Sequence, residues 1–95
     1  MTREEIIKTV SDCILKDRQN THGNPENNFQ TIADFWNIYT GCNFTARDVS
    51  VMMILLKIAR MKSSPNYLDN YVDAAGYAVI GGSLADDNNH RVHSK

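Results

Sequence analysis

Two cations and two carboxylates lie close together in the most apolar part of this chain, in the stretch LLKIARMKSSPNYLDNYVDAAGY. Lys57 and Arg60 are three residues apart, which places them on one face of a helix. Asp69 and Asp73 are four residues apart and share a face in the same way. A Ser-Ser-Pro break separates the two pairs, and a short turn there lets two helices pack antiparallel. We therefore expect the cations to lie beside the carboxylates.

Three interpretations of this charged group are open. Burying any one of the charges alone is costly, so each must face a partner, water or a ligand. Lys57 and Arg60 could form a narrow solvent-facing stripe, or all four residues could form a buried ion-pair network that fixes how the helices align. In the third interpretation the group binds an anionic ligand. The cations would then bind phosphates, and the carboxylates would bind a metal ion or form hydrogen bonds to a base or sugar.

A second group of polar residues lies in the segment DRQNTHGNPENN. One interpretation is a structural loop, in which Gly23 supplies an unusual backbone angle and Asn24 caps the next helix. The other is a lid whose Arg18 and His22 side chains hydrogen-bond a base or a phosphate.

The chain contains no nucleophile and base at catalytic spacing, and no glycine-rich phosphate loop after a strand.

The spacing of apolar residues predicts helices that would position these groups. Thr2 and Glu5 have the spacing of a capping box, which predicts a first helix that fades near Gln19. Pro25 is a favourable first residue for a second helix, and Gly41 is a favourable stop for it.

A third helix is predicted from Thr45, a good N-terminal cap, to the break before Pro65. The run VMMILLKIARM, residues 51–61, is apolar on nearly every side, so we expect this helix to be the central and most buried one. Because one small bundle cannot cover such a helix, the run also predicts a homo-oligomer.

A fourth helix is predicted from about Tyr67 to Leu84, with its end weakened by Gly81 and Gly82. Short loops between helices favour antiparallel neighbours. The predicted fold is therefore all-α, a compact four-helix bundle in a single domain over residues 1–85. Residues 86–95 are predicted to be a polar, flexible C-terminal tail.

Composition excludes several classes of function. The chain has 95 residues and a net charge of −1, which gives no electrostatic footprint for duplex nucleic acid. No apolar run approaches the ~20 residues of a membrane span, and the charged N-terminus is unlike a signal peptide. We therefore expect a cytoplasmic protein. Cys13 and Cys42 match no zinc or disulfide pattern and are expected to be buried free thiols.

Most of the chain, from about Asp17 to Leu84, resembles a known family. The segments DRQNTHGNPENNFQTIADFWNIYTG, DVSVMMILLKIARMK and YLDNYVDAAGYAVIGG are similar to small proteins common in tailed phages and prophages. That family in turn resembles the all-α MazG-like nucleotide pyrophosphohydrolases. The resemblance implies cleavage of nucleoside triphosphates to monophosphates, with Mg²⁺ held by E-x-x-E on one helix and E-x-x-D on the next. It also implies oligomers with sites between subunits.

The chain departs from the MazG-like motifs at the metal site. Lys57 and Arg60 occupy the positions of the first acidic pair. In the second motif Asp73 matches the aspartate, Asn70 replaces the glutamate, and Asp69 immediately precedes it. Exchanging two carboxylates for two cations shifts the local charge by about four, which repels a metal ion and attracts phosphate.

Three functions follow from these observations. The first is a phage-type nucleotide-binding protein that acts as a Mg²⁺-dependent pyrophosphohydrolase with a degenerate metal site, and the second is an oligomer that binds a nucleotide or nucleotide signal without cleaving it. The third is a helical accessory protein with no small ligand. Asp69 and Asp73 are the expected catalytic and metal-binding residues. The expected ligand-binding residues are Lys57, Arg60, His22, Arg18, Asn70 and Tyr77.

Overall fold

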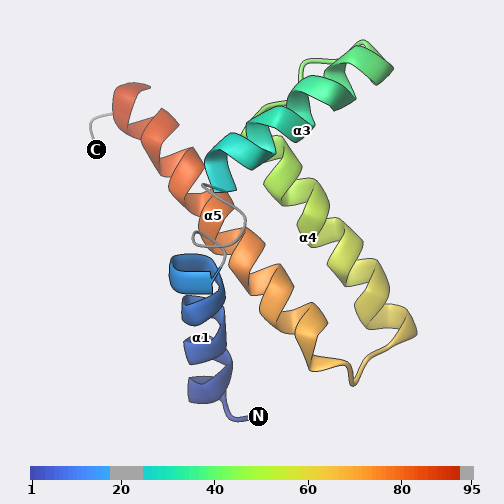
Figure 1. Cartoon of the computed structure of the whole chain (residues 1–95), viewed down its shortest axis with the longest axis vertical. Coiled ribbons are helices and arrows are strands. Elements are labelled where there is room, and N and C mark those ends of the chain that lie inside the picture. The colour runs from blue at the N-terminus through green and yellow to red at the C-terminus, as the bar shows by residue number, and fades with distance from the viewer. Residues whose placement is uncertain (18–24, 93–95) are drawn as a thin grey trace.

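A computed structural model of the chain describes residues 1–17 and 25–92, and within these ranges it contains helices and no strands (Figure 1). The elements are α1 (Arg3–Asp12), a π-helical segment η1 (Cys13–Asp17), α3 (Pro25–Thr40), α4 (Ala46–Ser63) and α5 (Leu68–Val92). The predicted all-α fold with four helices is confirmed. No helix of the described residues has the length and apolar character needed to cross a membrane.

The predicted N-terminal caps at Thr2 and Thr45 are present. The Thr2 hydroxyl accepts a hydrogen bond from the Glu5 backbone N–H at 3.1 Å, and the Glu5 carboxylate accepts one from the Thr2 N–H at 2.9 Å. Thr45 and Asp48 form the same reciprocal pair at the start of α4, at 3.2 Å and 2.9 Å. Each box satisfies two N–H groups that a helix terminus leaves without an intrahelical partner.

The ends of α3 also follow the sequence. The helix begins at Pro25, as predicted, while the proposed cap Asn24 lies outside the described residues. At its other end Gly41 adopts a φ of 73°, which a residue without a Cβ reaches at little cost.

Helices α4 and α5 form the antiparallel hairpin that the sequence predicts, and they lie side by side along most of α4 (Figure 1). Their contact is close at Gly81, where a Cβ atom would lie 2.7 Å from the Ser50 Oγ. Ser50 is fully buried and its hydroxyl donates a hydrogen bond to the Tyr77 carbonyl oxygen. The prediction that α5 ends near Gly81 and Leu84 was wrong, because the helix continues to Val92. The glycine serves this helix contact and is not a stop signal.

The central helix is α5, which packs against α1, α3 and α4, whereas α1 makes no contact with α4 (Figure 1). The prediction that residues 51–61 form the most buried helix was wrong. Only Ala46, Val49 and Ser50 of α4 are buried. Since α1 packs on the other side of α5, no described element covers the outer face of α4. The large apolar side chains exposed there are Val51, Met52, Leu55, Leu56 and Ile58.

The core is small and lies where α3, α4 and α5 meet. Its buried members are Phe29, Ala33, Ala46, Val49 and Ile80. Trp36 packs against this core and meets the Phe44 ring edge-on, with the ring centroids 6.2 Å apart.

Candidate functional site

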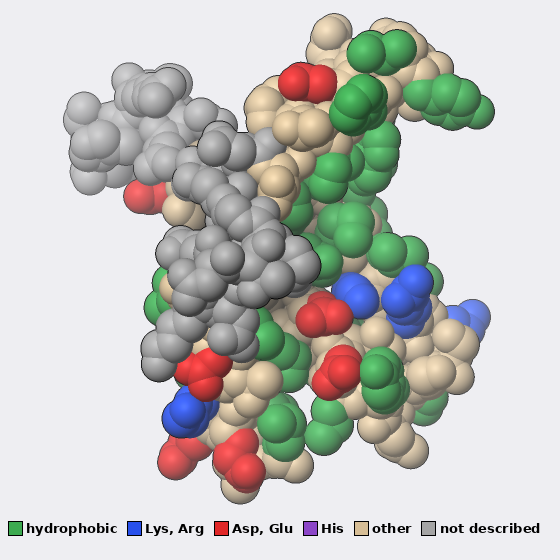
Figure 2. Space-filling view, in the orientation of Figure 1, with side chains coloured by type: hydrophobic (Ala, Val, Ile, Leu, Met, Phe, Trp, Pro, Cys, Tyr) green, Lys and Arg blue, Asp and Glu red, His purple; other side chains and the backbone are tan. Residues whose placement is uncertain are grey.

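The centre of the charged group is an ion pair between α4 and α5. The Lys57 Nζ lies 2.9 Å from the Asp73 Oδ2, so the predicted meeting of a cation and a carboxylate across the hairpin is confirmed for this pair. Lys57 lies four residues after Met53 and seven after Ser50, on the side of α4 that faces the core. Figure 2 shows Lys and Arg side chains beside Asp and Glu side chains over this hairpin.

The two partners differ in exposure. The Lys57 side chain is 11% exposed, whereas the Asp73 side chain is 34% exposed. The cation is therefore held at the helix interface by its long stem, while part of the carboxylate reaches the surface. This pair is neither a free surface stripe nor a fully closed buried pair.

Tyr67 joins the pair to a second carboxylate. A hydrogen bond to Asp69 raises the pKa of the Tyr67 phenol above its ordinary value. The charges of Asp69 and Asp73 act in the same direction, and that of Lys57 opposes them. The Tyr67 phenol therefore lies close to both carboxylates. We call Lys57, Tyr67, Asp69 and Asp73 the hairpin cluster.

Sequence reasoning missed Tyr67. It considered the tyrosines inside the helix, whereas Tyr67 lies just before α5 begins at Leu68. The signal was its spacing of two residues from Asp69, at a point where the chain leaves the turn. Tyr71, by contrast, turns away from the cluster and donates a hydrogen bond to the Pro65 carbonyl oxygen at 2.8 Å.

The predicted contact of Arg60 with a carboxylate is not formed in the described part of the chain. Arg60 is exposed. Its carbonyl oxygen accepts a hydrogen bond from the Ser64 N–H at 2.8 Å. Asp69, the partner expected from the spacing, lies beside Tyr67 instead and raises the pKa of its phenol. Arg60 remains on the same helix as Lys57, close to the hairpin end.

The other predicted ligand-binding residues are spread over several environments. Asn70 is buried, at 3% exposure, and lies on α5 one turn before Asp73. Tyr77 packs against the core, with its ring centroid 5.9 Å from that of Phe29. Arg18 and His22 lie outside the described residues.

Lys57 lines none of the hollows formed by described residues alone that lie beside α1, α4 and α5. The hollow next to Asp73 has about 10 Å³ of space and lies between Cys13, Ile14 and α5. One water molecule needs at least about 10–15 Å³, so this hollow is too small for a ligand.

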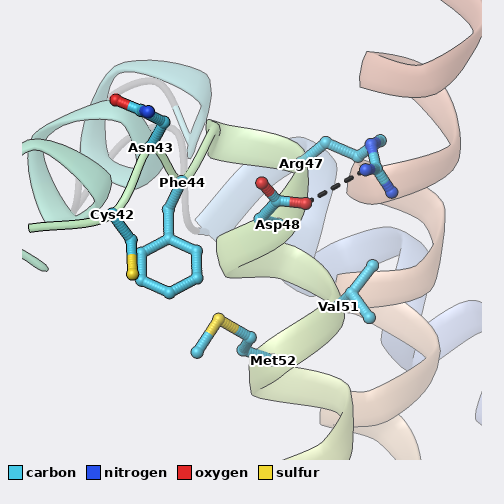
Figure 3. Close-up of a pocket in the computed structure, with 7 residues that line it drawn as sticks. All are labelled: Cys42, Asn43, Phe44, Arg47, Asp48, Val51 and Met52. Carbon is cyan, nitrogen blue, oxygen red and sulfur yellow. Dashed lines mark hydrogen bonds and ion pairs between the residues drawn. The ribbon is translucent and has the colours of Figure 1, made fainter. Parts of the chain in front are cut away.

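A larger open hollow of about 420 Å³ lies at the start of α4, away from the cluster. Figure 3 shows Phe44 and Met52 on one side of the helix, Arg47 and Val51 on the other, and Asp48 between them. Cys42 also lines it and is exposed, so the prediction that both thiols are buried was wrong for this one. It follows the turn at Gly41, where the apolar pattern of α3 has ended.

The donor groups of the cluster do not fit a resident Mg²⁺ site. Among the side chains that the structure describes, no three of His, Cys, Asp or Glu lie together as a possible metal site. Mg²⁺ requires near-octahedral oxygen ligation. Of the two carboxylates of the cluster, Asp73 pairs with Lys57 and Asp69 lies beside Tyr67. The cluster therefore does not provide the ligands of a resident Mg²⁺ ion.

Comparison with known proteins places the chain in a family. Residues 5–85 match the family described as a domain of unknown function, DUF6378. The chain belongs to this family. The match covers most of α1, all of α3 and α4 and most of α5, and it includes every member of the hairpin cluster.

Two curated relatives are phage proteins. The chain is 43% identical over 76 residues to the Gene 55 protein of Mycobacterium phage L5, which covers 79% of this chain and 49% of the relative. It is 36% identical over 75 residues to the Gene 55 protein of Mycobacterium phage D29, which covers 79% of this chain and 50% of the relative. The chain thus spans about half the length of these relatives. No solved structure matches it. The predicted resemblance to phage proteins is confirmed at this level.

Proposed function

We propose that this chain is a phage-type nucleotide-binding protein of the host cytoplasm, whose ligand contacts the hairpin cluster and is not cleaved. The observation that carries the proposal is the Lys57–Asp73 pair, with a mostly buried cation and a carboxylate that is one third exposed. Tyr67 and Asp69 lie beside it. One small area of the hairpin therefore offers a cation, two carboxylates and an exposed aromatic ring.

These groups match the parts of a nucleotide. Lys57, with Arg60 exposed on the same helix, supplies positive charge for phosphate oxygens. The carboxylates accept hydrogen bonds from sugar hydroxyls or from the amino group of a base. The exposed Tyr67 ring provides a face on which a base can stack.

The resemblance to the MazG-like superfamily supports a nucleotide as the ligand. The substituted residues of this chain argue against hydrolysis, because Lys57 pairs with the carboxylate that matches the aspartate of the second acidic motif. A metal ion at Asp73 would have to displace this ammonium group. Binding that does not depend on Mg²⁺ requires no such displacement.

A Mg²⁺-dependent nucleotide pyrophosphohydrolase is the second candidate. It is favoured by the placement of Asp69 and Asp73 four residues apart on one face of α5, with Asp73 partly exposed. In this case the ion would have to arrive with the triphosphate, because the protein donors alone do not hold it.

Titration calorimetry with a panel of nucleoside mono-, di- and triphosphates, with and without Mg²⁺, tests both candidates. Saturable binding without Mg²⁺ and without release of pyrophosphate is the expected result. Pyrophosphate release that needs Mg²⁺ and is abolished by Asp73→Asn would establish the hydrolase instead. If no nucleotide binds, the chain is a helical protein without this ligand and the proposal fails.

Arg60→Ala locates the site on the hairpin. We expect it to weaken binding by about 1.5–3 kcal/mol, the usual contribution of a hydrogen bond to a charged group. Lys8→Ala is the matched control, because it removes an exposed cation on α1, away from the cluster. Equal losses in the two variants would mean that the affinity reflects overall charge.

A further inference from the structure

The outer face of α4 is an unusual surface for an isolated chain. Leu55 is 59% exposed and Ile58 is 51% exposed, in a helix whose opposite side packs against α5. Single exposed apolar side chains are common, but a continuous apolar stripe marks a surface that is covered by a partner. Figure 2 shows hydrophobic side chains over α3 and the adjoining part of α4.

The spacing along this face is that of a helix–helix contact. Residues recur at intervals of three and four over two heptads, as in the seam between paired helices. At about 100° per residue, Leu55 lies roughly opposite Lys57 around the helix. We call this stripe the outer seam; its members are Asp48, Val51, Met52, Leu55, Ile58, Ala59 and Lys62.

The ends of the outer seam carry opposite charges placed symmetrically about its middle. Asp48 lies seven residues before Leu55, and Lys62 lies seven residues after it. If a second α4 runs antiparallel across a twofold axis at Leu55, Asp48 of each copy lies opposite Lys62 of the partner subunit. A parallel arrangement would place like charges together, which is unfavourable.

The apolar members of the outer seam follow the same symmetry. Val51 and Ala59 are each four residues from Leu55, and Met52 and Ile58 are each three residues from it. An antiparallel pair therefore places each of these side chains opposite an apolar partner. A twofold interface requires this self-complementarity.

We propose that two copies of this chain pair through the outer seam, with their α4 helices antiparallel about a twofold axis near Leu55. This pairing is independent of nucleotide binding, because the hairpin cluster lies around Lys57 on the opposite side of α4. The order of the charges along the outer seam favours a second copy of this chain as the partner that covers it.

The surroundings of the seam add to the contact. Stable interfaces cover about 800 Å² on each partner, which is more than one helical stripe provides. The exposed apolar side chains of α3 that could extend it are Phe35, Ile38 and Tyr39. The open hollow between Phe44, Met52 and Val51 lies at the N-terminal end of the seam (Figure 3), so it would face the C-terminal part of α4 of the partner subunit.

The other contacts of Asp48 leave an acceptor position for Lys62 of the partner subunit. Its carboxylate accepts the Thr45 N–H at the helix cap and lies 3.0 Å from the Arg47 guanidinium. Its side chain remains 32% exposed. An ionised carboxylate has about four acceptor positions, so a second cation can be accommodated.

Light scattering coupled to size exclusion tests the pairing. We expect the full chain to have twice the 10.7 kDa mass of one copy. Leu55→Glu should give a folded monomer, because it places two carboxylates at the axis from an exposed position. Ile7→Glu is the matched control: Ile7 is a similarly exposed apolar residue on α1, and this variant should stay dimeric. A monomeric full chain would overturn the proposal. So would a dimer that persists in Leu55→Glu or is lost in Ile7→Glu.

Disulfide trapping tests the direction of the helices in a Cys13→Ser, Cys42→Ser background. Leu55→Cys should link to itself on oxidation, because it lies at the axis. Ala59→Cys should not, since two copies of residue 59 would lie about 12 Å apart along antiparallel helices, too far for a disulfide. Self-linking of both variants would mean a parallel pair.

Lys62→Glu tests the charge order without changing an apolar contact. The variant should raise the dimer dissociation constant by about tenfold, and more at low salt, because two attractive pairs become repulsive. An unchanged dissociation constant would overturn the proposed contact between Asp48 and Lys62 of the partner subunit.

Discussion

Lys57 occupies a position that the spacing of α4 would otherwise give to an apolar side chain. It follows Ser50 and Met53 on the face that packs against α5, and its stem is mostly buried. A lysine can occupy such a position because its methylene chain packs like a hydrocarbon while its ammonium group reaches a carboxylate. The residue types alone predicted this pair, because an inward lysine near a turn requires a counter-charge on the returning helix.

Removing the Asp73 carboxylate should lower the free energy of unfolding more than replacing Lys57 by an apolar side chain. We expect Asp73→Asn to lower the free energy of unfolding by about 1–3 kcal/mol, less than for a fully buried pair because Asp73 is one third exposed. Lys57→Met should cost less, since it keeps the stem and removes the need for a counter-charge. Urea denaturation at neutral pH measures both values.

The pair of Lys8 and Asp12 on α1, at 3.1 Å, provides the control, because the Lys8 side chain is 77% exposed. Lys8→Met should change the free energy of unfolding by no more than about 0.5 kcal/mol. If Lys57→Met proves as damaging as Asp73→Asn, the pair contributes stability through its attraction and not through the burial of Lys57.

The spacing of charged residues did not predict that Asp69 lies beside Tyr67 and not beside Arg60. Spacing fixes which face of a helix a residue occupies, but the choice between Arg60 and Tyr67 as the partner of Asp69 depends on where the chain leaves the turn. That path is set by the residues between Ser64 and Tyr67, where the Tyr67 N–H donates to the Ser64 carbonyl oxygen at 3.2 Å. No pattern of charges in the sequence contains this information.

At the scale of elements, helix starts were predictable and one helix end was not. The caps at Thr2 and Thr45 are local, because donor and acceptor lie within three residues of each other. The role of Gly81 is not local. It depends on Ser50, which is far away in the sequence and is brought near only by the packing of α4 on α5.

Substitution of the two adjacent glycines should separate these effects. Gly81→Ala should destabilise the protein by about 1–3 kcal/mol, because its Cβ would lie 2.7 Å from the buried Ser50 Oγ, which is held by its hydrogen bond. Gly82→Ala should stabilise it by about 0.5–1 kcal/mol, since nothing lies within 4 Å and alanine favours a helix. Thermal and urea denaturation provide the measurement.

A double variant identifies the cause of the loss at Gly81. Ser50→Ala removes the nearest atom but leaves the Ser50 Cβ, which would lie 3.3 Å from the new methyl group. Part of the stability lost in Gly81→Ala should therefore return in the Ser50→Ala background. Simple addition of the two losses would show that the helices are not in close contact there.

At the scale of the whole molecule, the apolar run 51–61 predicted that its own chain covers α4 on most sides, and the structure contradicts this prediction. A sequence shows that a helix needs to be covered on most sides, but it does not show whether the cover comes from the same chain. Here α1 packs on the far side of α5 and leaves the outer seam exposed. The all-α fold and the α4–α5 hairpin were predictable because they depend on short connections, whereas the place of α1 depends on competition between two apolar faces.

If the outer seam pairs two copies, the stability of each copy depends on protein concentration. Association that involves only the folded state stabilises it by mass action, so the melting temperature should rise as the concentration rises. Between about 1 and 100 μM chain, we expect the melting temperature to increase measurably for the unsubstituted protein and for Ile7→Glu. The melting temperature of Leu55→Glu should not depend on concentration. At the lowest concentration the melting temperatures of the full protein and Leu55→Glu should converge, because Leu55 is exposed in a single copy. A melting temperature of the full protein that stays constant over this range would show that folding of one chain is complete without a second.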